Sequence, residues 1–213
     1  MKLSRYKDFD RNLKFLCEKY QIENYTINND GSIDVNGDVD ISFKDLERIP
    51  INFRNVTGEF HCDNNKLTTL EGSPIHVGKG FNCSSDNKTS NRLKNLIGAP
   101  EYVGGDFDCA YSGIKSLVGS PKYVGGVFYC DSNELSNFEG LENSKLIGKF
   151  LCVGNRIQEL YNLFNDKECI EFINDFDVIQ DDKIILDRLK EVYFALGLEV
   201  PRQIIINNAY EII

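Results

Sequence analysis

The sequence has no apolar stretch long enough to span a bilayer, and its first residues, MKLSRYKDFDRN, lack the apolar centre of a signal peptide. We therefore expect neither a membrane-spanning segment nor export, and a cytoplasmic location is predicted. Basic residues are also in deficit, because 24 lysines and arginines stand against 33 aspartates and glutamates, for a net charge of −9. That deficit argues against a nucleic-acid-binding surface. It suits a basic protein partner, and it also suits simple solubility.

Motifs of catalysis are missing too. The chain contains no P-loop, no dinucleotide-binding fingerprint, no nucleophile elbow and no C-x-x-C pair of the kind that zinc sites use. His61 adjoins Cys62, but neighbours on a strand point to opposite faces, so the two cannot act as nucleophile and base. We predict no enzyme activity, no cofactor and no metal site. The enzyme alternative, chemistry around Asp187, Arg188 and Glu191, competes with a solvated helical face.

What the chain does have is an internal repeat. Its core is the triplet Phe-x-Cys, in copies separated by 21, 26, 21 and 22 residues that begin at Phe60, Phe81, Phe107, Phe128 and Phe150. The long step contains a polar insertion within residues 84–91, and a degenerate earlier copy begins at Val39. Five of the seven cysteines occupy one position of this repeat. A secreted disulfide framework would not look like this, whereas free, buried thiols would.

The spacing within each copy predicts the fold. Phenylalanine and cysteine are two residues apart, so on a strand both point to one face, which a single copy cannot bury alone. Stacked copies can bury it, and we expect an α/β repeat solenoid with a parallel β ladder of about six rungs. The copies continue with an asparagine and two apolar residues, and three of them then have a Gly-x-Pro turn, at 72–74, 98–100 and 119–121. The asparagine should satisfy backbone groups at the turn after each strand. It is Asn65, Asn91, Asn133 or Asn155, and Ser112 replaces it in one copy.

The consensus V-x-G-x-F-x-C-x-x-N-x-L-x-x-L-x-G-x-P resembles the leucine-rich-repeat signature, with Phe-x-Cys in the place of Leu-x-Leu. It is more similar to repeat proteins of tailed bacteriophages, which carry strings of L-T-S-L-E-G-x-P-x-x-V-G-G-x-F-x-C. The segments LTTLEGSP (67–74) and VGGDFDC (103–109) match that string, and the resemblance extends to residues 24–39 and 186–189. It implies a leucine-rich-repeat-like fold and a phage protein that acts inside a bacterial host. It implies no particular activity.

The two ends of the chain are predicted to cap the ladder. Apolar residues at helical spacing predict a helix within residues 3–20, followed by a hairpin around the turn at residues 28–31. Residues 158–197 have the apolar faces of helices, and residues 203–206 and 210–213 offer a terminal strand. The predicted organisation is an N-terminal cap (1–36), a leucine-rich-repeat-like solenoid (37–157) and a C-terminal helical cap (158–213).

The residues that flank Phe and Cys are expected to point outward, onto the concave face where repeat proteins commonly bind partners. The early rungs are acidic and the later ones aromatic and aliphatic, which suits a protein partner with basic and apolar parts. The alternative is a solvated face, with Leu151 and Val153 covered by the C-terminal cap. The predicted partner-binding residues are Asp38, Asp40, Glu59, His61, Asp63, Asn82, Asp106, Asp108, Tyr129, Asp131 and Leu151.

The leading hypothesis is a non-enzymatic binding protein that engages a host protein through this face, as an inhibitor or an anti-defence factor. The insertion within residues 84–91 should rim the face, either as a partner contact or as a tolerated surface loop. A second hypothesis is capture of a small molecule, such as a signalling nucleotide, between the ladder and a cap. It needs basic groups near a pocket, and the acidic face argues against it. A third hypothesis is a structural component of the phage.

Overall fold

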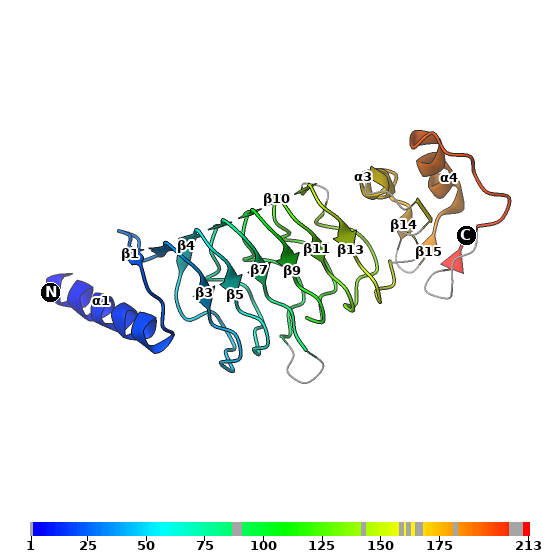
Figure 1. Cartoon of the computed structure of the whole chain (residues 1–213). Helices are drawn as coiled ribbons and strands as arrows, with labels where there is room; N and C mark the ends of the chain where they lie inside the picture. The colour runs from blue at the N-terminus through cyan, green and yellow to red at the C-terminus, as the bar shows by residue number, and fades with distance from the viewer. Residues whose placement is uncertain are drawn as a thin grey trace.

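The protein is a parallel β-solenoid, in which successive copies of the repeat form stacked coils (Figure 1). The predicted repeat solenoid is therefore confirmed. The computed structural model describes residues 2–86, 91–141, 144–157, 160, 163–164, 168–180, 183–204 and 211–213. The middle of the predicted insertion, much of the predicted helical stretch before residue 168 and part of the predicted terminal strand lie outside these residues.

Sheet B carries the Phe-x-Cys triplets, with one short strand for each copy. Adjacent strands pair in parallel, and equivalent residues lie side by side, as in Phe60↔Phe81 and Phe81↔Phe107. This register confirms the predicted ladder. The six strands, in spatial order, are β3 (Val39–Asp40), β5 (Phe60–His61), β7 (Phe81–Asn82), β9 (Phe107–Asp108), β11 (Phe128–Tyr129) and β13 (Phe150–Leu151).

A second sheet, sheet A, runs beside sheet B and was not predicted. Three of its later strands end at the valine that precedes the glycines of their repeat, and the last strand ends at Leu146, where we expected only a bend. Those glycines let the coils approach closely, because a Cβ atom on Gly104 would lie 2.2 Å from the carbonyl oxygen of Gly78. In spatial order the strands are β1 (Tyr25–Ile27), β2 (Ile33–Val35), β4 (Phe53–Val56), β6 (His76–Val77), β8 (Tyr102–Val103), β10 (Tyr123–Val124) and β12 (Lys145–Leu146).

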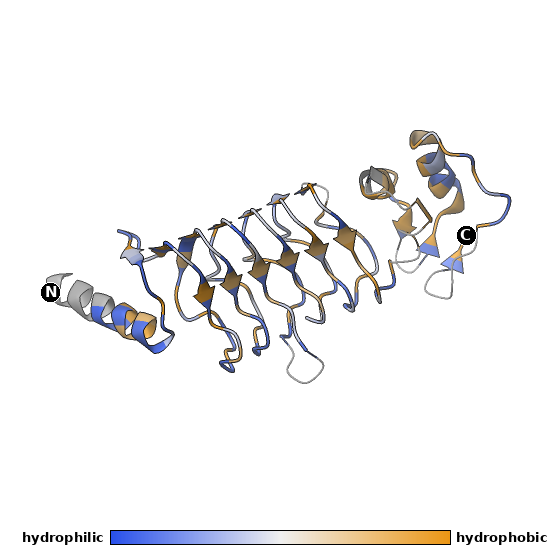
Figure 2. Cartoon of the chain, viewed as in Figure 1, coloured by the Kyte–Doolittle hydropathy of each residue, from blue (hydrophilic) through white to orange (hydrophobic). Residues whose placement is uncertain are grey.

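Two columns of side chains fill the interior behind sheet B, and hydrophobic residues follow the strands throughout the solenoid (Figure 2). The rings of Phe60 and Phe81 stack with centroids 5.5 Å apart, and the next ring, Phe107, follows at 5.4 Å. The cysteines beside them are free and buried, as predicted. Burial raises the pKa of these thiols, to about 12 for Cys152 and well above the ordinary value for Cys62, Cys83, Cys109 and Cys130.

The repeat asparagines bind the backbone at the turn after sheet B, as predicted. Asn65 accepts hydrogen bonds from the N–H groups of Lys44 and Leu46, at 2.9 and 3.0 Å, through its Oδ1. Its Nδ2 donates to the carbonyl groups of Ile41 and Cys62, at 2.9 and 3.0 Å. Each amide therefore ties one coil to the one before it. The pattern recurs, in whole or in part, at Asn91, Asn133 and Asn155.

The N-terminal end matches the prediction of a helix and a hairpin. Helix α1 (Lys2–Lys19) lies at one end of the solenoid (Figure 1), and its residues Leu13 and Cys17 are buried in the core. Strands β1 and β2 pair antiparallel, with Tyr25 opposite Val35. The helix contributes apolar side chains to the core at this end of the solenoid.

The C-terminal region differs from its prediction. Helices α3 (Glu168–Asp175) and α4 (Leu186–Ala195) occur, but β14 (Ile179–Gln180) and β15 (Lys183–Ile184) interrupt the stretch that we expected to be helical. These strands pair antiparallel, and β16 (Glu211–Ile212) adds to β15 in parallel. In the described part of the chain, no helix has both the length and the apolar character needed to cross a bilayer.

Candidate functional site: the outer face of sheet B

Three rows of side chains run along the outer face of sheet B, with one residue from each coil in each row. All the predicted partner-binding residues fall on these rows. The row before the phenylalanines is Asp38, Glu59, Gly80, Asp106, Val127 and Lys149. The middle row is Asp40, His61, Asn82, Asp108, Tyr129 and Leu151, and the row after the cysteines is Ser42, Asp63, Ser84, Ala110, Asp131 and Val153.

The aspartate and asparagine side chains of the middle row are held by hydrogen bonds from the backbone of their own coil. Asp40 Oδ1 accepts a hydrogen bond from the N–H of Ser42 at 2.9 Å, and Asn82 makes the same bond with Ser84 at 2.9 Å. Asp108 repeats it with Ala110 at 3.0 Å. Such bonds over two residues are typical of aspartate and asparagine. They hold these side chains in one orientation before any partner arrives.

Aspartates of the two outer rows join neighbouring coils. Asp38 Oδ1 accepts a hydrogen bond from the N–H of Glu59 at 2.8 Å. Asp106 accepts from Val127 at 2.7 Å, and Asp131 accepts from Val153 at 2.7 Å. The sequence analysis missed this role, because each bond joins residues 21 or 22 positions apart and depends on the register between coils.

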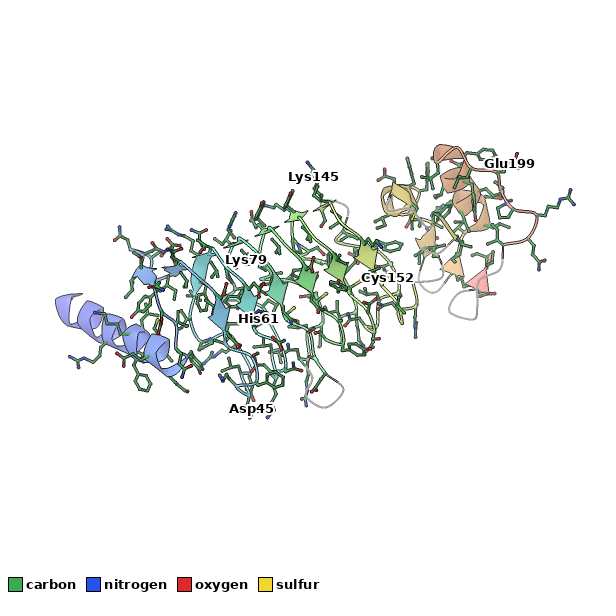
Figure 3. All side chains as sticks on the ribbon, in the orientation of Figure 1. Asp45, His61, Lys79, Lys145, Cys152 and Glu199 are labelled. Atoms are coloured by element: carbon green, nitrogen blue, oxygen red, sulfur yellow. The ribbon has the colours of Figure 1, made fainter. Side chains whose placement is uncertain are left out.

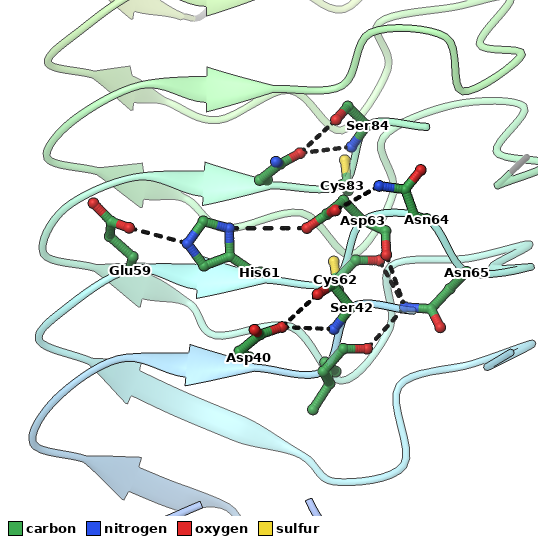
Figure 4. Close-up of polar contacts among 12 residues, drawn as sticks. Asp40, Ser42, Glu59, His61, Cys62, Asp63, Asn64, Asn65, Cys83 and Ser84 are labelled. Atoms are coloured by element: carbon green, nitrogen blue, oxygen red, sulfur yellow. Dashed lines mark hydrogen bonds and ion pairs between the residues drawn. The ribbon is translucent and has the colours of Figure 1, made fainter. Parts of the chain in front are cut away.

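His61 sits between two carboxylates (Figure 4). Its Nε2 lies 3.0 Å from Glu59 Oε2, and its Nδ1 lies 3.8 Å from Asp63 Oδ1. Cys62 points to the opposite side of the strand and is fully buried, as the alternation predicted. Since burial also raises the pKa of the Cys62 thiol well above its ordinary value, the geometry gives no nucleophile beside this histidine.

The carboxylates of the face affect the pKa of one of their number, Asp108. Burial, together with the charges of Asp131, Asp63 and Asp106, raises the pKa of the Asp108 carboxyl above its ordinary value. Like charges close together disfavour further ionisation. The face therefore favours a cationic group that would lie among these carboxylates and relieve their repulsion.

The acidic rows give way to apolar residues towards the last coil. Tyr129 and Leu151 are half-buried, and Val153 is 56% exposed. The expectation that the C-terminal region covers Val153 is therefore wrong. Apolar side chains of this region, such as Cys169, Ile184 and Leu189, are instead buried in the hydrophobic core. An apolar end remains available on the face.

Sheet A has an outer face of a different kind, which the sequence analysis did not single out. The rings of His76 and Tyr102 stack with centroids 4.3 Å apart, and Tyr123 continues the stack at 4.7 Å. The signal was present, since each residue directly precedes the valine of its repeat. Next in this row comes Lys145, at the edge of the solenoid away from Asp45 (Figure 3). Stacked rings present their edges to solvent. This row therefore makes the outer face of sheet A rigid and gives it little acidic charge.

Comparisons of the chain with protein-family models, with curated proteins and with solved structures found no match. Within the described ranges, the side chains of histidine, cysteine, aspartate and glutamate form no group of three that could hold a metal ion. The geometry of the described residues is therefore what bears on function.

Proposed function

We propose that this protein is a non-enzymatic binding protein, which engages a partner protein through the outer face of sheet B. The observation that carries the proposal is the change along that face from carboxylates, in three of the first four coils, to Tyr129, Leu151 and Val153 in the last two. A surface of this kind fits a partner that presents basic side chains beside an apolar patch. Aromatic and aliphatic anchors supply binding energy, while complementary charge favours the correct register and speeds association.

The fixed side chains of the face support the proposal. Ordering a flexible side chain at an interface opposes binding by about 0.5–1.5 kcal/mol. Here Asp38, Asp106 and Asp131 are already held by backbone N–H groups, at 2.7–2.8 Å. The middle-row oxygens of Asp40 and Asp108 are held as well. Less conformational entropy is then lost when a partner binds.

The cellular setting is part of the same proposal. The resemblance of the repeat to that of tailed-phage proteins supports a phage-encoded protein whose partner is a protein of the bacterial host. In that setting the protein acts in the host cytoplasm, as an inhibitor or an anti-defence factor. Buried thiols suit a reducing compartment, because nothing in the coils needs a disulfide.

The test is retention of a host protein by the full-length chain, compared with a variant that carries Asp38→Asn, Asp106→Asn and Asp131→Asn. Asparagine keeps an oxygen that can accept the hydrogen bond between coils, as Asn82 does within its coil, so the fold should persist while three charges are lost. We expect wild type to retain a protein whose binding weakens with added salt and falls at least tenfold in the triple variant.

A matched control removes the same number of charges elsewhere, with Glu47→Gln, Glu71→Gln and Glu139→Gln, all exposed on turns outside sheet B. It should bind the partner as wild type does. Tyr129→Ala tests the apolar end and should also weaken binding. Equal retention by wild type and the Asp38/Asp106/Asp131 variant, with both folded by circular dichroism, would overturn the proposal.

A further inference from the structure

A hollow of about 520 Å³ lies at the turns that follow sheet B, across three consecutive coils. Its lining includes Arg92 and Lys94 from one coil, Tyr111 and Lys115 from the next, and Glu134 from the third. Small-molecule sites commonly have volumes of about 300–1,000 Å³. None of its lining residues belongs to the three rows of the sheet B face, so it is a separate candidate site.

The hollow exists because one coil lacks a side chain. Residues at this position of the repeat directly follow the turn asparagine, or Ser112, and Gly113 stands between Arg92 and Glu134 in the neighbouring coils. A Cβ atom built on Gly113 would find its nearest neighbour, the carbonyl oxygen of Leu93, only at 3.8 Å. The space is therefore open, and charged side chains of the adjacent coils border it.

Positive charge gathers here in a chain whose net charge is −9. Two carboxylates, Asp86 and Glu134, also line the hollow, and Glu134 pairs with Lys115 at 3.3 Å. Among the described residues, neither Arg92 nor Lys94 forms an ion pair with a carboxylate. Lys66, at the same repeat position as Arg92, is by contrast paired with Asp45 at 2.9 Å. Two cations in the hollow are thus left for an anionic ligand.

An aromatic ring at the hollow has a backbone that disfavours it. Tyr111 has φ of 56°, in the left-handed region, and its side chain is 47% exposed. Other coils place Phe43, Asn64, Ser132 and Gly154 at this position, also with positive φ. Asparagine and glycine adopt this conformation more readily than a bulky residue does. Of the two rings at this repeat position, Tyr111 lines the hollow, and an exposed ring offers a face on which a planar group can stack.

We propose that this hollow binds a nucleotide, with its phosphates on Arg92 and Lys94 and its base against Tyr111. Guanidinium and ammonium groups are the usual protein partners of phosphate, and stacking of a base on an aromatic ring tolerates any base. Lys115, held by Glu134, completes the basic rim. The site does not depend on a partner protein at sheet B, and each can exist without the other.

The test is isothermal titration of the full-length chain with ATP, AMP and pyrophosphate as probes. We expect ATP to bind best, because it combines the ring with several phosphates. Arg92→Gln with Lys94→Gln should weaken ATP binding by about tenfold or more, as expected when charge-assisted hydrogen bonds are lost. Tyr111→Asn should weaken ATP and leave pyrophosphate unchanged. This variant should fold, since Asn64 has φ of 52° at the same repeat position.

Lys66→Gln is the matched control, because it removes one cation from the same column outside the hollow; it should leave ATP affinity unchanged. Failure of ATP to bind would overturn the proposal, and so would equal ATP affinity in wild type and the Arg92/Lys94 variant. Equal affinity for ATP and pyrophosphate, unaffected by Tyr111→Asn, would overturn the assignment of a nucleotide. The Asp38/Asp106/Asp131 variant should bind ATP normally, so failure at sheet B and failure here are distinguishable.

Discussion

The interior and the outer face of sheet B are built on the same strands, yet they follow opposite rules. Behind the sheet, the same residue types recur in coil after coil, as in the column from Phe60 to Phe150 and its partner column of cysteines. On the outer face, the middle row changes at every step, from Asp40 through His61 to Leu151. Stacking requires identity inside because each ring packs against its own kind. The outer face is free of that requirement, so its residues can vary to suit a ligand.

The largest expected effect comes from breaking the interior. Phe107→Ala removes a fully buried ring that lies 5.4 Å from the ring of Phe81 and 4.8 Å from that of Phe128. We expect the free energy of unfolding to fall by about 3–5 kcal/mol, since the ring's contacts are lost and a cavity remains. Urea denaturation followed by circular dichroism measures it. The variant Leu151→Ala, in the middle row of the outer face, should lose about 1 kcal/mol or less, and an equal loss for both would erase the contrast.

The next effect concerns the asparagine of the turn. Asn133 makes four hydrogen bonds of 2.9–3.1 Å to the backbone groups of Cys109, Cys130, Ser112 and Ile114. Asn133→Ala should lower the free energy of unfolding by about 2–3 kcal/mol, because buried N–H and carbonyl groups lose their partners. Thermal unfolding gives the comparison. Asn95→Ala, which removes one exposed bond to Ile97, should change stability far less.

A smaller effect should separate the two roles of an outer-row aspartate. Asp106→Ala removes the acceptor of the Val127 N–H and should cost about 1 kcal/mol of stability. Asp106→Asn keeps an acceptor and should leave stability nearly unchanged while it removes the charge. Chemical denaturation of both variants decides the matter. A large loss in the asparagine variant would mean that the charge itself stabilises the coils.

The smallest of these effects concerns the direction in which ionisation of Asp108 changes stability. Because the folded-state pKa of Asp108 is raised, its contribution to stability is present at low pH and is lost as the pH rises through that pKa. Asp108→Asn, which cannot ionise, should therefore be more stable than wild type at neutral pH by less than about 1 kcal/mol. The difference should vanish in acid. Thermal melts at several pH values measure it, and a difference independent of pH would contradict the electrostatic cause.

Asp40 provides the opposite case in the same row. Burial alone would raise the pKa of Asp40, but hydrogen bonds from Ser42 and the charges of His61 and Lys44 bring it below its ordinary value. Stability from this group is present above the unfolded-state pKa and is lost as the pH falls through the folded-state pKa. Asp40→Asn should thus lose stability at neutral pH and match wild type in acid.

Prediction from sequence succeeded where the structure repeats. Phe-x-Cys fixed the register of sheet B, because the two side chains must face one interior. The strands of sheet A beyond the hairpin were missed, because in most of them a single inward-facing residue, such as Val77 or Val103, gives no alternation to read, whereas each copy on sheet B has both a phenylalanine and a cysteine. In the C-terminal region, the apolar spacing that predicts helices up to Phe176 and again from Ile185 does not mark the strands between them, and only the pairing of β14 with β15 reveals those strands.

The candidate sites likewise have features that the sequence predicts and features that it does not. The rows of the sheet B face follow directly from alternation about the phenylalanines. The hydrogen bonds of Asp38 and Asp106 do not, because they join residues 21 positions apart in the sequence. The hollow at Gly113 could not be predicted from the sequence, because it is defined by the missing side chain of a glycine that lies in space between Arg92 and Glu134.

The glycines that follow the strands of sheet A allow the number of coils in this protein to vary. The Gly104 and Gly125 backbones pack directly against the coil before them, where a Cβ atom would meet a carbonyl oxygen at 2.2 Å. Close main-chain packing at these glycines therefore helps to set the step between coils, together with the turn asparagines. Removing residues 107–127 would join two compatible coils and shorten the molecule by one whole unit. Copying or deleting a coil would thus lengthen or shorten the outer face of sheet B by one residue in each of its three rows.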